Sequence, residues 1–210
     1  LLWEPLPATP GTRRDEPRRV SLLATTPAGA VVYRGRLPMG LAEPGSGAVA
    51  SFDVPPGAIE MRLTIEGDGA GTLDTETRDL VVPDLSAPEV MIGTPRVWFA
   101  RNALEFAALS ADATVVPTAA REFRRTDRLL VRFDALAPGT TQPAVSAQLL
   151  NQQGTSMLDI PVTAPTAAGE PYTLDLALAS FAPGHYLLAL RAESVGHEPV
   201  TELVAFRLGS

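Results

Sequence analysis

Cysteine and lysine are both absent from this chain of 210 residues. Without cysteine the chain has no disulfide, no thiolate nucleophile and no cysteine-based zinc site. Small secreted animal-type modules usually carry a disulfide, so the absence indicates a bacterial origin or an intracellular place. All 17 basic residues are arginine, and because Ala, Gly and Pro are abundant as well, we interpret the arginine usage as coding bias.

Histidine is also scarce, and no catalytic motif replaces it. The only two histidines are His185 and His197, and neither belongs to an H-x-x-H or H-E-x-x-H spacing of a zinc hydrolase. No G-x-S-x-G nucleophile elbow occurs, and no Gly-Lys-Ser/Thr follows Gly45 and Gly47 as a phosphate-binding loop would need. We therefore assign no catalytic residue, expect no cofactor and predict that the protein is not an enzyme.

The chain has neither a basic surplus nor a long apolar run. Its net charge of −7 argues against nucleic acid and anionic lipid as partners. No stretch of about 18 apolar residues occurs, so we predict no membrane span. The apolar fraction of 45% is normal for a globular core. Because the chain begins at Leu1 without a charged and apolar leader, we expect it to be a mature portion of a longer protein.

One segment occurs twice. Residues 52–83 and 181–209 each contain Pro-Gly, an alternating apolar run, a turn with Gly, Thr-Glu and a second alternating run. Alternation with period two is typical of half-buried strands, and two such runs around a short turn predict a β-hairpin. The match pairs Ile59 with Tyr186 and, after a one-residue difference in the turn, Leu80 with Phe206. We interpret each copy as the last hairpin of its own β-sandwich.

Many further short alternating runs predict an all-β protein. In the first half we expect strands at 19–25, 30–36, 48–54, 59–66 and 73–82, and in the second at 90–99, 128–135, 144–151, 157–162, 172–176, 186–193 and 201–208. Residues 102–108 fit one turn of helix or a short strand, and residues 112–119 are expected to be extended. Periodicity is lost at 82–88, which contains two prolines. We predict an N-terminal arm or linker at 1–14 and two tandem immunoglobulin-like or fibronectin III-like β-sandwiches at 15–85 and 86–210.

The acidic turn from Glu66 to Asp74 alternates oxygen-bearing residues with glycines, as calcium loops do. It lacks the further carboxylates and the closing Glu of an EF-hand, and calcium requires six to eight oxygen ligands. Asp and Gly are also the residues that turns use. We interpret the segment as a hairpin turn and predict no metal site.

Arginines gather in one place, and one exposed aromatic is expected beside them. The candidate binding surface comprises Trp98, Arg121, Arg124, Arg125 and Arg128. The arginines either form a solvated face that is paired with acids or bind an acidic partner. Trp98 alternates with Val97 and Phe99 and so faces away from the core, where it either packs against a neighbouring domain or offers a platform to a sugar or peptide.

The phrases FDVPPGAIEMRLTIE, TRDLVVPDLS, IGTP and REFRRTDRLLVRF resemble the C-terminal region of acidobacterial-type von Willebrand factor A-related proteins, over about residues 15–210. The resemblance implies a secreted or envelope-associated bacterial protein in which a β-rich extension follows an A domain. The metal-site motif D-x-S-x-S of an A domain is absent, because the segment from Asp84 to Pro88 departs from it at the last position. The family therefore supplies no functional residue for this chain.

Together these patterns predict a non-catalytic structural or protein-interaction module pair, whose partner is another protein or another domain of the same polypeptide. Short strands leave sheet edges that can pair with a partner strand. The alternative is a carbohydrate-binding accessory domain, for which Trp98, Tyr33 or Tyr172 would form an exposed platform.

Overall fold

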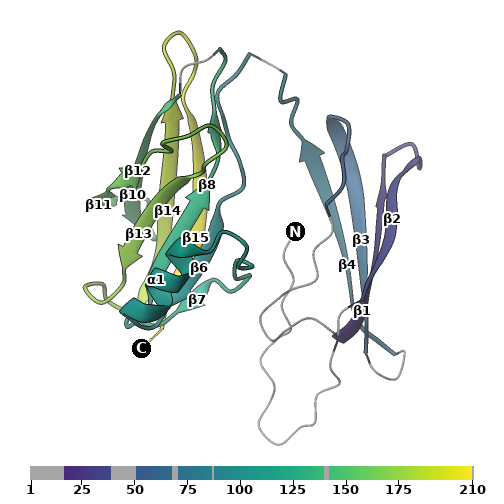
Figure 1. The fold of residues 1–210 in the computed structure, drawn as a ribbon, viewed down its shortest axis with the longest axis horizontal. Helices are drawn as coiled ribbons and strands as arrows, with labels where there is room; N and C mark the ends of the chain where they lie inside the picture. The colour runs from purple at the N-terminus through teal and green to yellow at the C-terminus, as the bar shows by residue number, and fades with distance from the viewer. Residues whose placement is uncertain (1–16, 39–50, 68–70, 87, 140–141, 210) are drawn as a thin grey trace, which may run out of the picture. The chain divides into compact units, whose positions relative to one another are not determined.

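A computed structural model describes residues 17–38, 51–67, 71–86, 88–139 and 142–209 of the chain (Figure 1). The chain divides at Pro88 into two compact units, which we call the N-terminal and the C-terminal unit. The division falls within the proline-containing segment 82–88 in which the strand pattern stops. Each unit is described by itself.

The N-terminal unit contains one four-stranded antiparallel sheet. Its strands are β1 (Pro17–Thr25), β2 (Val31–Pro38), β3 (Gly57–Gly67) and β4 (Thr72–Val82), in the order β2-β1-β3-β4. Alternate residues of the two central strands are buried, as period-two sequences dictate. The buried set on this inner face is Val20, Leu22, Ala24, Ile59, Met61, Leu63 and Ile65.

The C-terminal unit is a sandwich of two sheets. One sheet has the order β11-β10-β14-β15-β7 and the other β12-β13-β8-β6, with a two-stranded β5-β9 ribbon beside them. The elements are β5 (Met91–Ile92), β6 (Arg96–Ala100), α1 (Ala103–Ala111), β7 (Glu122–Phe123), β8 (Arg128–Phe133), β9 (Ala135–Leu136), β10 (Ala144–Asn151), β11 (Ser156–Ile160), β12 (Val162–Thr163), β13 (Tyr172–Ala177), β14 (Gly184–Glu193) and β15 (Val200–Leu208).

Apolar side chains from the facing sides of both sheets form the core of this sandwich. Phe133 and Leu174 come from one sheet, and Leu149, Leu188 and Leu190 come from the other. All five side chains have at most 2% of their surface exposed. Interdigitated layers of this kind are what an immunoglobulin-like sandwich requires.

The structure contains both copies of the repeated segment as antiparallel hairpins, β3–β4 and β14–β15. Ile59 pairs with Leu80 in the first, and Tyr186 pairs with Phe206 in the second. Because Ile59 corresponds to Tyr186 and Leu80 to Phe206, the two hairpins share one register, in agreement with the sequence match. In the second copy the Tyr186 hydroxyl donates to the Ala182 carbonyl, 2.7 Å away, which is the tyrosine-corner contact of immunoglobulin-like domains.

The repeat extends to the preceding hairpin, where the sequence match is too weak to show it. In β1–β2 the N–H of Gly29 donates to the Thr26 carbonyl, and in β10–β11 the N–H of Gly154 donates to the Asn151 carbonyl, both at 2.9 Å. The two glycines lie 125 residues apart and have φ of 81° and 78°, a left-handed conformation that favours glycine. The sheet β2-β1-β3-β4 therefore corresponds to β11-β10-β14-β15.

The structure confirms the all-β class, with one short helix. Residues 102–108 belong to a helix start rather than to a strand: the side chain of Asn102 accepts from the N–H of Glu105, and Ala103 begins α1. The prediction of a strand at 48–54 is wrong for its described residues, since residues 51–55 are not in a strand. In the described residues the N-terminal unit has one sheet, so a complete sandwich at 15–85 remains a prediction.

Candidate functional site

Trp98 faces away from the core, as its alternation with Val97 and Phe99 predicts, but it is not exposed. Only 5% of its surface is accessible, and its indole N–H donates to the Val115 carbonyl at 3.0 Å. Helix α1 contacts β6 and β8, and the chain that follows the helix reaches Trp98 through Val115. The expectation of Trp98 as a binding platform is therefore corrected, because the α1 segment covers that face of the sheet.

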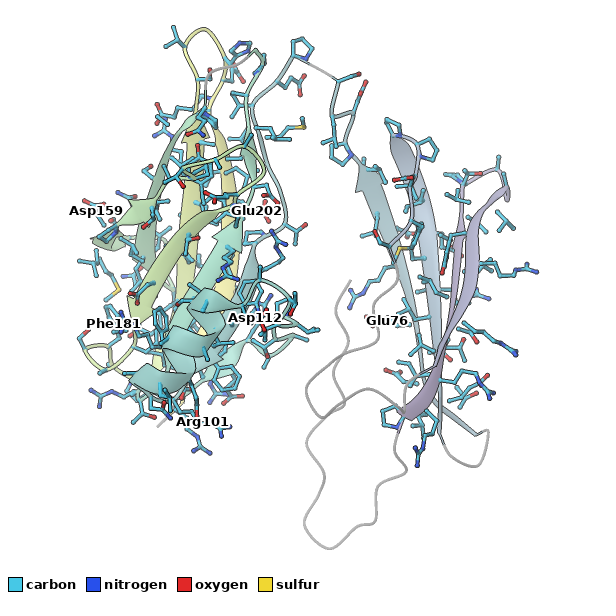
Figure 2. All side chains as sticks on the ribbon, in the orientation of Figure 1. Glu76, Arg101, Asp112, Asp159, Phe181 and Glu202 are labelled. Atoms are coloured by element: carbon cyan, nitrogen blue, oxygen red, sulfur yellow. The ribbon has the colours of Figure 1, made fainter. Side chains whose placement is uncertain are left out.

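Arg132 lies beside Trp98 and fixes the end of the helix. Its guanidinium donates to the carbonyls of Leu109, Ser110 and Asp112 at 2.9, 2.9 and 3.3 Å, and it lies 5.2 Å from the centre of the Trp98 ring. Asp112 marks the end of α1 in Figure 2. A buried cation that satisfies the last carbonyls of a helix stabilises that helix terminus. Arg132 is thus a structural residue, although it belongs to the arginine-rich sequence.

Arg128, the last arginine of the predicted surface, is paired within the chain. It donates from Nε to Asp175 Oδ1 at 2.7 Å and from a second nitrogen to the other oxygen of the same carboxylate. The hydrogen bond that Arg128 donates to Asp175 raises the pKa of Arg128. The guanidinium also lies 4.1 Å from the centre of the Phe106 ring, on α1. A bidentate ion pair of this kind leaves little charge for an external anion.

Of the other three arginines, Arg121 directly precedes β7, and Arg124 and Arg125 lie between β7 and β8. Arg121 donates to the carbonyls of Thr118 and Ala120, each at 2.9 Å, and Arg125 donates to the Ala179 carbonyl at 2.9 Å. The side chain of Arg124 is exposed. Arg121, Arg125 and Arg128 therefore bind neighbouring backbone and carboxylate groups. The four arginine side chains do not converge on one point.

A hollow of about 360 Å³ lies on the outer face of the β14–β15 hairpin, and Arg121, His185 and Arg207 are among its lining residues. Its cations are engaged: Arg207 lies 3.7 Å from the Glu122 carboxylate, and Arg121 holds the carbonyls described above. The hollow is lined by residues that lie far apart in the sequence. Its two arginines are already bonded to other groups of this protein.

The aromatic platform of the carbohydrate alternative does not form from the three predicted residues. Tyr172 is 3% exposed and donates its hydroxyl to the Pro143 carbonyl at 2.8 Å. Burial also raises the pKa of its phenol. Tyr33 is half-buried and stacks on Phe52 with ring centres 4.1 Å apart. With Trp98 buried as well, Tyr33 alone retains a partly exposed ring.

The most open interaction feature is the strand β4. It forms one edge of the N-terminal sheet, and among the described residues no strand pairs with its outer side. Every residue of β4 is exposed except Glu76 and Val82, which are half-buried. Val81 has 80% and Leu73 39% of its surface accessible. A long edge strand with unpaired peptide groups is a template for strand addition.

The corresponding strand in the C-terminal unit has a covered edge. There β7 runs parallel to β15, and the N–H groups of Arg207 and Gly209 donate to the carbonyls of Arg121 and Phe123 at 2.8 and 2.9 Å. In the described residues of the N-terminal unit nothing equivalent to β7 lies on β4. The same hairpin thus has an edge that is shielded at its C-terminal end, 207–209, in one unit and, among the described residues, an unpaired edge in the other.

The hydrogen bonds of β15 also identify which peptide groups of β4 point outward. Alternate residues of a strand direct their peptide groups to opposite edges. Since Arg207 and Gly209 donate outward, the odd-numbered residues of β15 face its outer edge. A shift of 126 residues places Val81 at the position of Arg207, because Leu80 and Phe206 correspond. The outward residues of β4 are therefore Thr75, Thr77, Asp79 and Val81, while a β-bulge at Leu73, opposite Ile65, interrupts the alternation.

The side chains of β4 divide between two faces. Asp74, Glu76 and Arg78 pair with buried residues of β3, so they lie on the inner face, and Glu76 forms an ion pair with Arg78 of the same strand. Glu76 and its counterpart Glu202 are labelled in Figure 2. Charges on the inner face of an edge strand limit unspecific pairing. One sequence signal could have identified β4: it carries more charged residues than the equivalent, more apolar strand β15.

In the part of the chain that the structure describes, no three His, Asp or Glu side chains are grouped as metal ligands. The turn interpretation of residues 66–74 agrees with the bond from the Gly67 N–H to the Gly71 carbonyl, while residues 68–70 lie outside the described residues. Among the described helices none is long and apolar enough to cross a membrane.

No family model matches the chain, and no curated protein matches it. The resemblance to von Willebrand factor A-related proteins therefore remains a prediction. Among solved structures, the chain is similar to CopC from Methylosinus trichosporium OB3b, with a TM-score of 0.29 and 18% identity over 43% of this chain and 84% of CopC. It is also similar to a tetra-tandem repeat in the extending region of a large adhesion protein, with a TM-score of 0.28 and 11% identity over 93% of this chain. The chain spans 42% of that repeat structure.

Proposed function

We propose that this chain is a non-catalytic protein-interaction module pair that binds a partner by strand addition to β4. The edge of β4 carries the proposal, because among the described residues no strand pairs with it and it is exposed along nearly its whole length, whereas β7 covers the C-terminal end of its counterpart β15. Outward N–H and C=O groups give affinity in strand addition, and the alternating side chains give specificity.

The proposed setting is a secreted or envelope-associated bacterial protein, supported by the sequence resemblance. No nucleophile with an adjacent base was recognised in the sequence, so the proposal contains no catalytic step. The engaged guanidiniums of Arg121, Arg125 and Arg128 direct the proposal to β4 rather than to the arginine cluster.

Site-specific photo-cross-linking tests the proposal with a matched control. A photoreactive amino acid at Val81 is compared with the same residue at Arg207, the equivalent outward position on the covered edge. After irradiation with envelope and extracellular fractions of the source bacterium, we expect defined adducts from Val81 and only background from Arg207. Peptide mapping should place the partner's cross-linked residue in an extended segment. Equal adducts from both positions, or none from Val81, would refute the proposal.

A further inference from the structure

Strand β4 is self-complementary about its central residue. It runs from Thr72 to Val82, so Thr77 lies at its midpoint. Around that point Glu76 mirrors Arg78, with which it forms an ion pair, and Thr75 mirrors Asp79. Such a sequence presents the same surface to a copy of itself when the copy is rotated by 180°.

We propose that β4 pairs antiparallel with β4 of a second copy of this chain, about a two-fold axis at Thr77. The proposal rests on the proposed function, since it takes β4 as the strand-addition edge and names its partner. An isologous contact of this kind closes to a dimer and leaves no further open β4 edge.

The backbone groups support this register. From Thr75 to Val81 the outward residues of β4 are the odd-numbered ones, so Thr77 would pair with Thr77 of the copy and Thr75 with Asp79. Each such pair exchanges two N–H···O=C bonds, which gives about six hydrogen bonds over the three pairs. A register with the axis between two residues would place the outward groups of one strand opposite inward groups of the other, so the axis must lie at a residue.

The charges select the same register. Glu76 of each strand lies opposite Arg78 of the other on the inner face, at a non-hydrogen-bonded pair, where side chains approach most closely. Since Glu76 and Arg78 already pair within one strand, the dimer would hold four alternating charges around the axis. A shift that moved the axis by one residue to Glu76 would bring two carboxylates opposite each other.

Head-to-tail addition of β4 to β2 of another copy fits less well. Arg34 and Arg36 of β2 pair with Leu23 and Ser21, so they lie on the outer face. Of the β4 acids, Asp74 and Glu76 lie on the inner face and would not meet them, and only Asp79 shares the outer face. Most of the opposite charges of the two edges therefore fall on opposite faces of the extended sheet.

Sedimentation equilibrium of the whole chain tests the dimer from about 10 μM to about 1 mM, a range that covers the affinities of small interfaces. In the variant Thr77→Pro the outward N–H at the axis is lost, while the N–H groups that bind β3 remain, and proline is tolerated at such edge positions. We expect dimerisation at least about tenfold weaker. The control Leu203→Pro changes the equivalent residue of β15, 126 positions later, and should leave the dimer unchanged.

Charge reversal tests the register. Glu76→Arg alone or Arg78→Glu alone places like charges opposite each other and should weaken the dimer at least about tenfold. The double variant Glu76→Arg with Arg78→Glu restores opposite charges in the proposed register and should dimerise like the wild-type chain. Thermal unfolding of each variant verifies that the N-terminal unit is folded.

The outcomes separate this inference from the proposed function. A wild-type chain that stays monomeric at about 1 mM, or a double variant as weak as the single ones, overturns the β4 dimer. If the monomer still gives Val81 adducts with another protein, strand addition stands and only the identity of the partner is wrong. If neither a dimer nor an adduct is found, both proposals fail.

Discussion

Replacing Arg132 by methionine probes the support of the α1 cover. The change removes three hydrogen bonds to the carbonyls of Leu109, Ser110 and Asp112 and the contact with the Trp98 ring, while it keeps an unbranched side chain of similar length. Arg132 is 9% exposed. The substitution therefore removes a charged hydrogen-bond donor from a nearly buried position on β8.

The expected cost follows from those contacts. A hydrogen bond to a charged group contributes about 1.5–3 kcal/mol, but the freed carbonyls belong to the exposed last turn of α1 and regain water, so we take about 1 kcal/mol for each. The contact with Trp98 adds about 1 kcal/mol. Burying methionine instead of a cation recovers part of the loss. We expect Arg132→Met to lower the free energy of unfolding by about 2–4 kcal/mol.

Urea unfolding monitored by Trp98 fluorescence measures this loss, in a Trp3→Phe background so that one tryptophan reports. The matched control is Arg128→Met, which lies on the same face of β8 but is 44% exposed and joined to Asp175. We expect a loss below about 1 kcal/mol there. Hydrogen exchange should also accelerate in residues 103–116 of the Arg132 variant only. Equal losses in the two variants would refute the role assigned to Arg132.

Two further predictions concern the loops of the C-terminal sandwich. Tyr186→Phe removes the hydroxyl that donates to the Ala182 carbonyl at 2.7 Å and should cost about 1–2 kcal/mol in urea unfolding; an unchanged midpoint would contradict the tyrosine corner. Glu170 accepts hydrogen bonds from the hydroxyl and N–H of Thr166 and from the N–H of Ala167, which lower its pKa. Because the folded pKa is depressed, this stabilisation is present at neutral pH and is lost as the pH falls below about 4. In a plot of the urea unfolding midpoint against pH, Glu170→Gln should therefore reduce the decrease of the midpoint at acidic pH. An unaltered decrease would contradict the role of Glu170.

The strands that carry apolar residues at every second position could be predicted from the sequence. Leu129, Val131 and Phe133 line one face of β8, and the Ile59–Leu80 pair sets the register of β3–β4. Such positions are readable because burial on one face of a sheet forces period two. Residues 102–108 fit both a helix and a strand, since a helix as short as α1 has too few residues for a 3.6 period to show.

The candidate surface could not be predicted residue by residue. The direction of Trp98 follows from alternation, but its burial depends on α1 and on Val115, 17 residues further along the chain. Likewise the charge of Arg128 is cancelled by Asp175, 47 residues away. Exposure and pairing of this kind are set by contacts between distant segments, which local periodicity does not encode.

The duplicated hairpin shows the same division between sequence and tertiary structure. The sequence by itself determined that the hairpin occurs twice, that each copy has the same register and that the class is all-β, because strand alternation and turn residues are local properties. Only the tertiary structure decided that the repeat extends to β1–β2 and β10–β11, where turns with the same hydrogen bonds are built from different residues. It also decided that β7 covers the C-terminal end of the β15 edge, while among the described residues no strand covers the edge of β4. The physical reason is that an edge is defined by its non-local neighbour, which no local pattern can specify.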